Sequence, residues 1–214
     1  MTPLQKWMRK NLTKNEQKIF KKLNTPIKVQ NYLSSLPINF EETGESLMSP
    51  RRLIKAKKAH CMEAAMFAAA ALAYHGQKPL LLDFQSRPDD QDHVIAIFKQ
   101  NNRWGAISKT NHSILRWRDP VYKSVRELAM SYFHEYLMDS GMKSLRAFSK
   151  PFNLSKYKPE RWVTTEKNLW WLADELDESS HETIALPSVL KNLRRADKIE
   201  LKAMKLLEWQ KKKK

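Results

Sequence analysis

The apolar positions of the first 48 residues repeat at helical spacing. Thr13 and Glu16 form the pattern of an N-terminal capping box, and the apolar side chains after them fall on one helix face. A second helix is expected from the first-turn proline Pro26 to near Pro37. Residues 1–48 are therefore predicted to be a helical N-terminal extension, whose apolar faces need a partner surface.

Residues 64–73 form a continuous apolar run. Most of them are alanine, and Gly76 follows as a stop signal. Small side chains on every face let a helix approach its neighbours closely, which is typical of a central helix that lies against a sheet. The run is too short to cross a bilayer, and Glu63 and His75 bracket it. We therefore expect a buried helix that begins near Cys61.

Three apolar runs of strand length follow this helix, at residues 80–84, 94–98 and 103–108. Pro79 and a polar loop limit the first run, and the Asn101-Asn102 pair favours a tight turn between the other two. Residues 93–108 are therefore predicted to form an antiparallel hairpin. One helix followed by three strands predicts an α+β fold, with the helix packed on an antiparallel sheet.

After the strands the apolar pattern is helical again. Ser124 and Glu127 repeat the capping-box pattern and open an amphipathic helix predicted over residues 125–138. Residues 143–162 are basic and show no firm periodicity. We therefore expect the core of the protein to span residues 49–140.

Two helices are predicted near the C-terminus. Thr165 is expected to cap one that runs through Leu176, and Ser188 a long one that reaches residue 207. Residues 141–214 are thus predicted to be a basic linker and a helical C-terminal extension. We expect its last residues, which end in four lysines, to be disordered.

Cys61 is the only cysteine of the chain, and it lies where the central helix is predicted to start. A thiol in the first turn of a helix faces unpaired N–H groups and the positive end of the helix dipole, which favour the thiolate. Arg51, Arg52, Lys55, Lys57 and Lys58 precede it in the sequence. These features indicate a catalytic nucleophile. The alternative is that Cys61 is a small buried apolar residue, as free cysteines commonly are.

Three short motifs carry a resemblance to a known family: AHCME at 59–63, DDQDH at 89–93 and RWGAI at 103–107, preceded by SPRR at 49–52. Residues 49–122 resemble the transglutaminase-like family of the papain-like cysteine hydrolases. The resemblance implies an α+β core in which the helix that opens with Cys61 packs on an antiparallel sheet. It also implies that Cys61 is the nucleophile and His93 the base, and it implies no particular substrate.

The third member of the catalytic set is open, because the strand that normally ends in an Asp here ends in Ser108. Asn111 is our candidate, since a side-chain oxygen there can orient His93 as the Asn of papain-type enzymes does. Ser108 and Asp119 are the alternatives, although Asp119 can simply pair with a neighbouring arginine. His60 is a second candidate base, ranked lower because adjacent side chains at a helix start are expected to diverge.

Composition limits the remaining possibilities. A single cysteine excludes an internal disulfide and a cysteine-type zinc site, and no other ligand cluster stands out, so we expect no cofactor and no metal. No run is long and apolar enough for a membrane span, and residues 1–6 lack the apolar core of a secretory signal, so we expect a cytoplasmic protein. The formal charge of +16 favours an anionic partner on a basic surface.

Two hypotheses of function follow. The first is a cysteine-dependent amidase, peptidase or acyl transferase that acts on an amide or ester, with an acyl substrate that can be a peptide or protein. The second is a catalytically inactive transglutaminase-like binding protein that uses its basic surface to hold an acidic partner or nucleic acid. The absence of Asp at position 108 favours the second, and coupling between Cys61 and His93 would favour the first.

Overall fold

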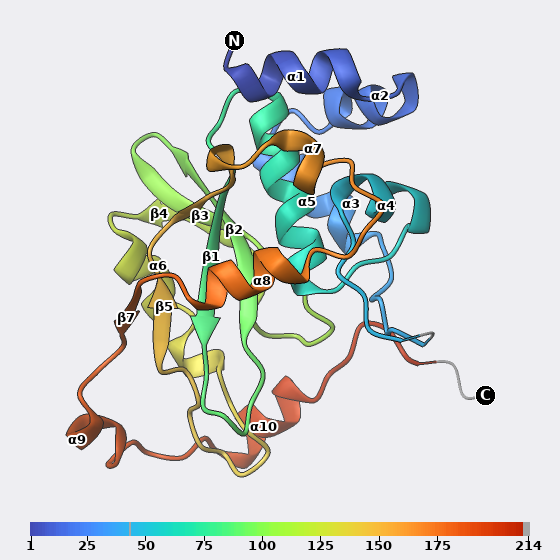
Figure 1. Ribbon diagram of the computed structural model, residues 1–214. Coiled ribbons are helices and arrows are strands. Elements are labelled where there is room, and N and C mark those ends of the chain that lie inside the picture. Colours follow the sequence, from blue (N-terminus) through green and yellow to red (C-terminus); the bar gives the residue numbers. More distant parts are fainter. Residues whose placement is uncertain (43, 212–214) are drawn as a thin grey trace.

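The computed structural model describes residues 1–42 and 44–211. Helices α1–α5 (residues 3–74) gather on one side of a twisted antiparallel sheet, α6 (Val125–Met130) packs on its other face, and the C-terminal chain runs along one end of that sheet (Figure 1). The strands are β1 (Leu80–Gln85), β2 (His93–Gln100), β3 (Arg103–Ile107), β4 (Arg118–Tyr122), β5 (Ala147–Ser149), β6 (Phe152–Asn153) and β7 (His181–Thr183). Their order is β4-β3-β2-β1-β5-β7, with β6 also pairing with β1. The predicted α+β class with an antiparallel sheet is confirmed.

Four helices precede the central one: α1 (Pro3–Asn11), α2 (Lys14–Lys22), α3 (Pro26–Ser34) and α4 (Pro50–Ala56). The capping box of α2 is present as predicted, because Glu16 N donates to Thr13 Oγ1 and Thr13 N donates to the Glu16 carboxylate. Their buried side chains join the central helix in one apolar core. The domain boundaries expected at residues 48/49 and 140/141 stay a prediction.

The central helix is α5 (Cys61–Tyr74), and every residue from Met62 to Tyr74 in it is buried. It lies against the sheet face formed by alternate side chains of β1 and β2, among them Leu81 and Ala96. Because a run of alanines adds almost no side-chain bulk, the helix and sheet can approach closely without leaving voids. This packing holds the first residue of the helix, Cys61, beside the start of β2.

The hairpin predicted over residues 93–108 is confirmed. β2 and β3 pair in antiparallel register up to Gln100 and Arg103. Asn101 and Asn102 between them have φ values of 48° and 58°, the left-handed conformation that a two-residue turn of this kind requires at both positions. The turn fixes the register of the strand that carries His93.

The helix predicted over residues 125–138 is wrong in length. It ends at Met130 as α6 (Val125–Met130) and is followed by a 3₁₀ turn at Phe133–Glu135. The aromatic side chains of Tyr132, Phe133 and Tyr136 all join the core on the second face of the sheet. A continuous helix would also place these three side chains on one face, so their spacing does not distinguish the two arrangements, and tertiary packing decides where the helix ends.

The long helix predicted from Ser188 to residue 207 is also wrong. Two short helices replace it, α9 (Pro187–Leu190) and α10 (Lys198–Met204). The chain between them is held extended, since Ala196 N donates to Gly141 O and Lys143 Nζ donates to Arg194 O. Ile199 is 71% exposed, so the apolar side chains here lack the core that a long amphipathic helix needs.

The helix expected after Thr165 begins later, as α8 (Trp170–Asp177), and the basic region before it holds a 3₁₀ turn (Leu154–Lys156) and α7 (Pro159–Trp162). The C-terminal chain then passes below the sheet, as its red trace shows in Figure 1. The disorder expected for the last residues concerns 212–214, which lie outside the described residues. No helix in the described part of the chain has the length and apolar character needed to cross a bilayer.

A largely buried aspartate–histidine hydrogen bond links β1 and β7. His181 Nε2 is 3.1 Å from Asp83 Oδ2, and His181 Nδ1 is 2.7 Å from the Ser179 carbonyl oxygen. The second Asp83 oxygen, Oδ1, is buried without a hydrogen-bond partner among the described residues. Burial raises the pKa of Asp83 to about 6, with His181 acting against that rise and the charges of Asp92 and Asp177 adding to it.

Candidate functional site

A pocket of about 550 Å³ opens at the N-terminal end of α5. Cys61, His60 and His93 lie in its wall, and the loop 89–92, the segment 109–115 and the segment 135–139 form most of the rest. Met204, from α10, closes part of the lining. The segment after β3 thus borders the candidate site.

Cys61 is the first residue of α5 and is partly exposed in this pocket. Burial alone would raise the pKa of its thiol. Hydrogen bonds with His60 and His93, together with their positive charge, outweigh burial and hold the Cys61 pKa well below its ordinary value. Both histidines therefore favour the thiolate of Cys61.

His93 begins β2 and is buried. Its Nε2 atom lies 2.8 Å from Ser108 Oγ, and Ser108 Oγ lies 2.5 Å from the carbonyl oxygen of Leu115. A carbonyl only accepts, so the Ser108 hydroxyl donates its one proton to Leu115 and must accept from His93. His93 is therefore protonated at Nε2, which leaves Nδ1 as the nitrogen available to Cys61.

Ser108 is itself held in place by Gln30 of α3. Ser108 N donates to Gln30 Oε1 at 2.9 Å, and Gln30 Nε2 donates to Ser108 O at 2.9 Å. A side-chain amide that pairs with both main-chain groups of one residue fixes that residue as a neighbouring strand would. The role of Gln30 could not be predicted from the sequence, because no local pattern links residues as far apart along the chain as Gln30 and Ser108.

His60 also contacts Cys61, so the expectation that these adjacent side chains diverge is wrong. His60 is the N-cap of α5, with an extended backbone (φ −94°), whereas Cys61 is already helical. The usual angular separation of helical neighbours therefore does not apply. Burial would lower the His60 pKa, but the Cys61 sulfur, the Glu63 carboxylate and the Ser46 carbonyl together raise it to about 9.

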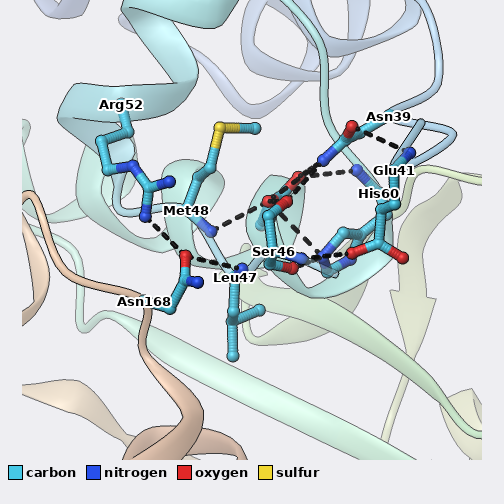
Figure 2. A network of polar contacts seen from close by, with 9 residues as sticks. Asn39, Glu41, Ser46, Leu47, Met48, Arg52, His60 and Asn168 are labelled. Carbon is cyan, nitrogen blue, oxygen red and sulfur yellow. Dashed lines mark hydrogen bonds and ion pairs between the residues drawn. The ribbon is translucent and has the colours of Figure 1, made fainter. Parts of the chain in front are cut away.

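Glu63 is the buried centre of a polar network at the start of α5. Its carboxylate accepts hydrogen bonds from Asn39 Nδ2, Ser46 Oγ, Met48 N and His60 N, at distances between 2.9 and 3.4 Å. In Figure 2 these donors converge from the loop before α4 and from the start of α5. His60 Nε2 lies 3.5 Å from Glu63 Oε1 and 2.9 Å from the Ser46 carbonyl oxygen. The network therefore holds a negative charge beside His60.

The structure directs Asn111 and Asp119 away from His93. Both polar atoms of the Asn111 side chain pair with the main chain of Trp209. Asp119 lies exposed in β4. The arginines expected to pair with Asp119 instead contact Glu208 and Glu135. Of the three candidates for the third position, Ser108 is the one in contact with the His93 ring.

Lys109 also lines the pocket, and no pattern in the sequence pointed to it. Its Nζ atom donates to the carbonyl oxygens of Leu33 and Leu36 at the end of α3. Burial lowers the pKa of Lys109 to about 8. No group of three or more His, Cys, Asp or Glu side chains in residues 1–42 and 44–211 has the arrangement of a metal site.

A buried helix that opens with a cysteine, set against an antiparallel sheet whose strand supplies a histidine, defines a protein of the papain-like α+β class. Comparison with protein families matches residues 2–123 to a family described as a transglutaminase-like domain. This match covers more than half of the chain, so the chain belongs to the transglutaminase-like family. Comparison with curated proteins finds no match.

Proposed function

We propose that the protein is a cysteine-dependent hydrolase or acyl transferase that acts on an amide or ester through Cys61 and His93. The observation that carries the proposal is the hydrogen-bond chain from Leu115 through Ser108 to His93. It presents His93 Nδ1 to the Cys61 thiol as a proton acceptor, and the charge of the resulting imidazolium is one of the causes of the low Cys61 pKa. These are the requirements of a nucleophile paired with a general base.

In the proposed reaction the Cys61 proton passes to His93 Nδ1, and the thiolate attacks the substrate carbonyl carbon. The carbonyl oxygen gains the negative charge and lies near the first-turn N–H groups of α5, which stabilise it. Collapse of this intermediate breaks the bond to the amine or alcohol, which leaves with the proton from His93. Water or a second amine then gives a proton to His93, attacks the thioester and frees the Cys61 sulfur.

Ser108 is proposed as a positioning residue and not as a catalytic one, because it acts through His93. Its hydroxyl is a neutral acceptor and fixes the tautomer of the ring, but it contributes no negative charge. His60 is proposed to stabilise the Cys61 thiolate, since its raised pKa keeps it cationic at neutral pH. In this arrangement the cationic His60 stabilises the Cys61 thiolate, and the Glu63 carboxylate in turn stabilises the cationic form of His60.

The alternative proposal is a transglutaminase-like binding protein without catalysis. Ser108 in place of an acidic residue favours it, because an uncharged partner stabilises an imidazolium less than a carboxylate does. The formal charge of +16 would then serve an acidic protein or a nucleic acid. This alternative predicts salt-sensitive binding that survives Cys61→Ala.

The experiment that separates the two proposals uses p-nitrophenyl acetate as the acyl donor. We expect a burst of p-nitrophenolate, an acetyl group on Cys61 by mass spectrometry, and continued turnover as the thioester hydrolyses. Cys61→Ser controls for other nucleophiles and should show no burst. Acetylation at the same rate in the His93→Ala protein would overturn the proposed role of His93, and no acetylation at all would favour the binding protein.

A further inference from the structure

The C-terminal chain pairs with the segment that borders the pocket. Ser113 N donates to Leu206 O at 3.1 Å, and Glu208 N donates to Asn111 O at 2.9 Å. These two bonds flank the antiparallel bridge between His112 and Leu207. Residues 206–208 therefore lie along residues 111–113 as a short added strand, which is the way that many proteins bind extended peptides.

Asn111 extends this pairing by one residue. Its Nδ2 donates to Trp209 O at 3.0 Å, and its Oδ1 accepts from Trp209 N at 2.8 Å. The side chain thus engages both main-chain groups of one residue. Such contacts do not depend on the side chain of the bound residue, so they suit any extended peptide in this register.

Two ion pairs add a charge pattern to the main-chain contacts. Lys205 Nζ lies 3.1 Å from Asp139 Oδ1, and Arg116 Nη2 lies 2.8 Å from Glu208 Oε2. The bound segment thus presents a basic residue and, three positions later, an acidic one. Asp139 lines the pocket, and three further pocket residues, Asp89, Asp90 and Asp92, are also acidic.

Met204 is buried and Trp209 half-buried, but the two leucines between them contribute little apolar burial. Leu206 is 64% exposed and Leu207 is 44% exposed, although both are large apolar residues. Residues 203–209 are therefore held by the buried Met204 and part of Trp209, by two ion pairs, and by individual hydrogen bonds that include those of His112 to Met204 O and of Ser113 to Ala203 O. Each polar contact contributes on the order of 1 kcal/mol. A competing peptide can replace the same contacts one for one.

We propose that residues 111–113 form a binding edge for an extended peptide with a basic residue followed three positions later by an acidic one. Residues 205–209 of the chain occupy this edge at rest. Asn111, His112 and Met204 line the same pocket as Cys61. The edge therefore brings a peptide to the candidate site, and it deepens the proposed function by naming the substrate class and a self-inhibited resting state.

The test uses a fluorescent peptide with the sequence of residues 203–211, AMKLLEWQK, and full-length protein in a Cys61→Ala background. Glu208→Pro removes the N–H that bonds to Asn111 O and should release the resident segment. Gln210→Pro is the matched control, because no described hydrogen bond involves the Gln210 N–H. By fluorescence anisotropy we expect Glu208→Pro to bind the peptide at least tenfold more tightly than Gln210→Pro or the parent, since the resident segment no longer competes.

Three further measurements test whether the peptide binds at this edge. Amide hydrogen exchange at Ser113 should become faster in Glu208→Pro without peptide and slow again when the peptide is added, while the core strands stay protected. Adding Asn111→Ala should abolish the gain in affinity, and a peptide with Lys205 and Glu208 exchanged should bind more weakly. A released segment with no peptide binding, or binding that survives Asn111→Ala, overturns the proposal.

The outcome is independent of the proposed chemistry. Peptide binding is measured with the thiol removed, so a failure to acetylate Cys61 leaves this result untouched. Conversely, Cys61 can prove to be active while residues 111–113 bind no peptide. That outcome would support the proposed reaction and contradict the proposed substrate class.

Discussion

His93 Nε2 and Ser108 Oγ lie 2.8 Å apart, and the Ser108 proton is committed to the Leu115 carbonyl. In the proposed mechanism this serine does one part of the work of an aspartate, because it sets the tautomer and orientation of the imidazole ring. The other part, a negative charge near the reacting pair, comes from the opposite side of Cys61, where Glu63 is buried beside His60. Orientation and charge are thus divided between two positions.

This division predicts a moderate effect of Ser108→Ala. We expect the rate of Cys61 acetylation by p-nitrophenyl acetate to fall about tenfold, because His93 loses one hydrogen bond and its fixed tautomer. Ser108→Thr keeps the hydroxyl and should restore most of the rate. Ser188→Ala, whose side chain makes no described hydrogen bond, is the control. Equal rates for the parent protein and Ser108→Ala would contradict the positioning role.

The two histidines predict a characteristic pH profile for Cys61. We expect its rate of alkylation by iodoacetamide to reach half-maximum well below pH ~8.5, the value for a free thiol, because His60 and His93 lower the Cys61 pKa. The midpoint should move upward in His93→Ala and also in His60→Ala. His112→Ala removes a pocket histidine that does not lower the Cys61 pKa, and it should leave the midpoint in place. If the midpoint is the same in the parent, His93→Ala and His60→Ala, the two histidines do not lower the Cys61 pKa and the proposed charge coupling is contradicted.

Glu63→Gln should destabilise the protein strongly. One carboxylate oxygen would become an NH2 group that only donates, so either Asn39 Nδ2 and His60 N or Ser46 Oγ and Met48 N would face a donor in place of their acceptor. We expect a loss of about 2–4 kcal/mol in the free energy of unfolding, measured by urea denaturation. Glu178→Gln changes an exposed carboxylate that forms no ion pair among the described residues, and it should cost less than about 0.5 kcal/mol.

Glu63→Gln also tests whether the charge of Glu63 influences the Cys61 thiol through His60. In protein that remains folded, removal of the Glu63 charge should lower the pKa of His60 and so weaken its support of the thiolate. The midpoint for alkylation of Cys61 should then rise. A strongly destabilised Glu63→Gln with an unchanged midpoint would assign Glu63 to stability alone.

The Asp83–His181 pair predicts a pH dependence of stability. Because the folded-state pKa of Asp83 lies above its ordinary 3.8, its contribution to stability is full below about pH 4 and is lost as the pH rises through about 6. Asp83→Asn removes this titration. We expect the variant to gain on the order of 2 kcal/mol relative to the parent between pH 4 and pH 8. Asp174→Asn, an exposed neighbour on α8, should show no such trend in urea unfolding at the two pH values.

The core of the fold could be predicted because its signals are local. The Thr13 capping box, the alanine run of α5 and the Asn101-Asn102 turn each depend on neighbouring residues, and each is present as expected. The helices at 125–138 and 188–207 failed for the opposite reason. Their lengths depend on contacts with the far face of the sheet and with Gly141, which a sequence pattern does not contain.

For the candidate site as well, the features that depend on neighbouring residues could be predicted, and those that depend on distant residues could not. Cys61 at a helix start and His93 at a strand start are visible in the sequence, and the structure places both in one pocket. Gln30 and the clamp of Asn111 on Trp209 depend on partners far away in the chain. The backbone change between His60 and Cys61 likewise hides their contact, because a helical projection places these two side chains in different directions.

The alanines of α5 affect how precisely the first residue of the helix, Cys61, is positioned. Alanine has no side-chain rotamers, so the contact between helix and sheet costs no side-chain entropy when it forms and offers no alternative packing afterwards. A leucine-rich interface can repack and let a helix shift by a fraction of an ångström, whereas here the backbone itself is the contact surface. The place of the sulfur relative to the two imidazole rings is therefore set by main-chain geometry, and a single added methyl group in the middle of α5 would be felt at its first residue.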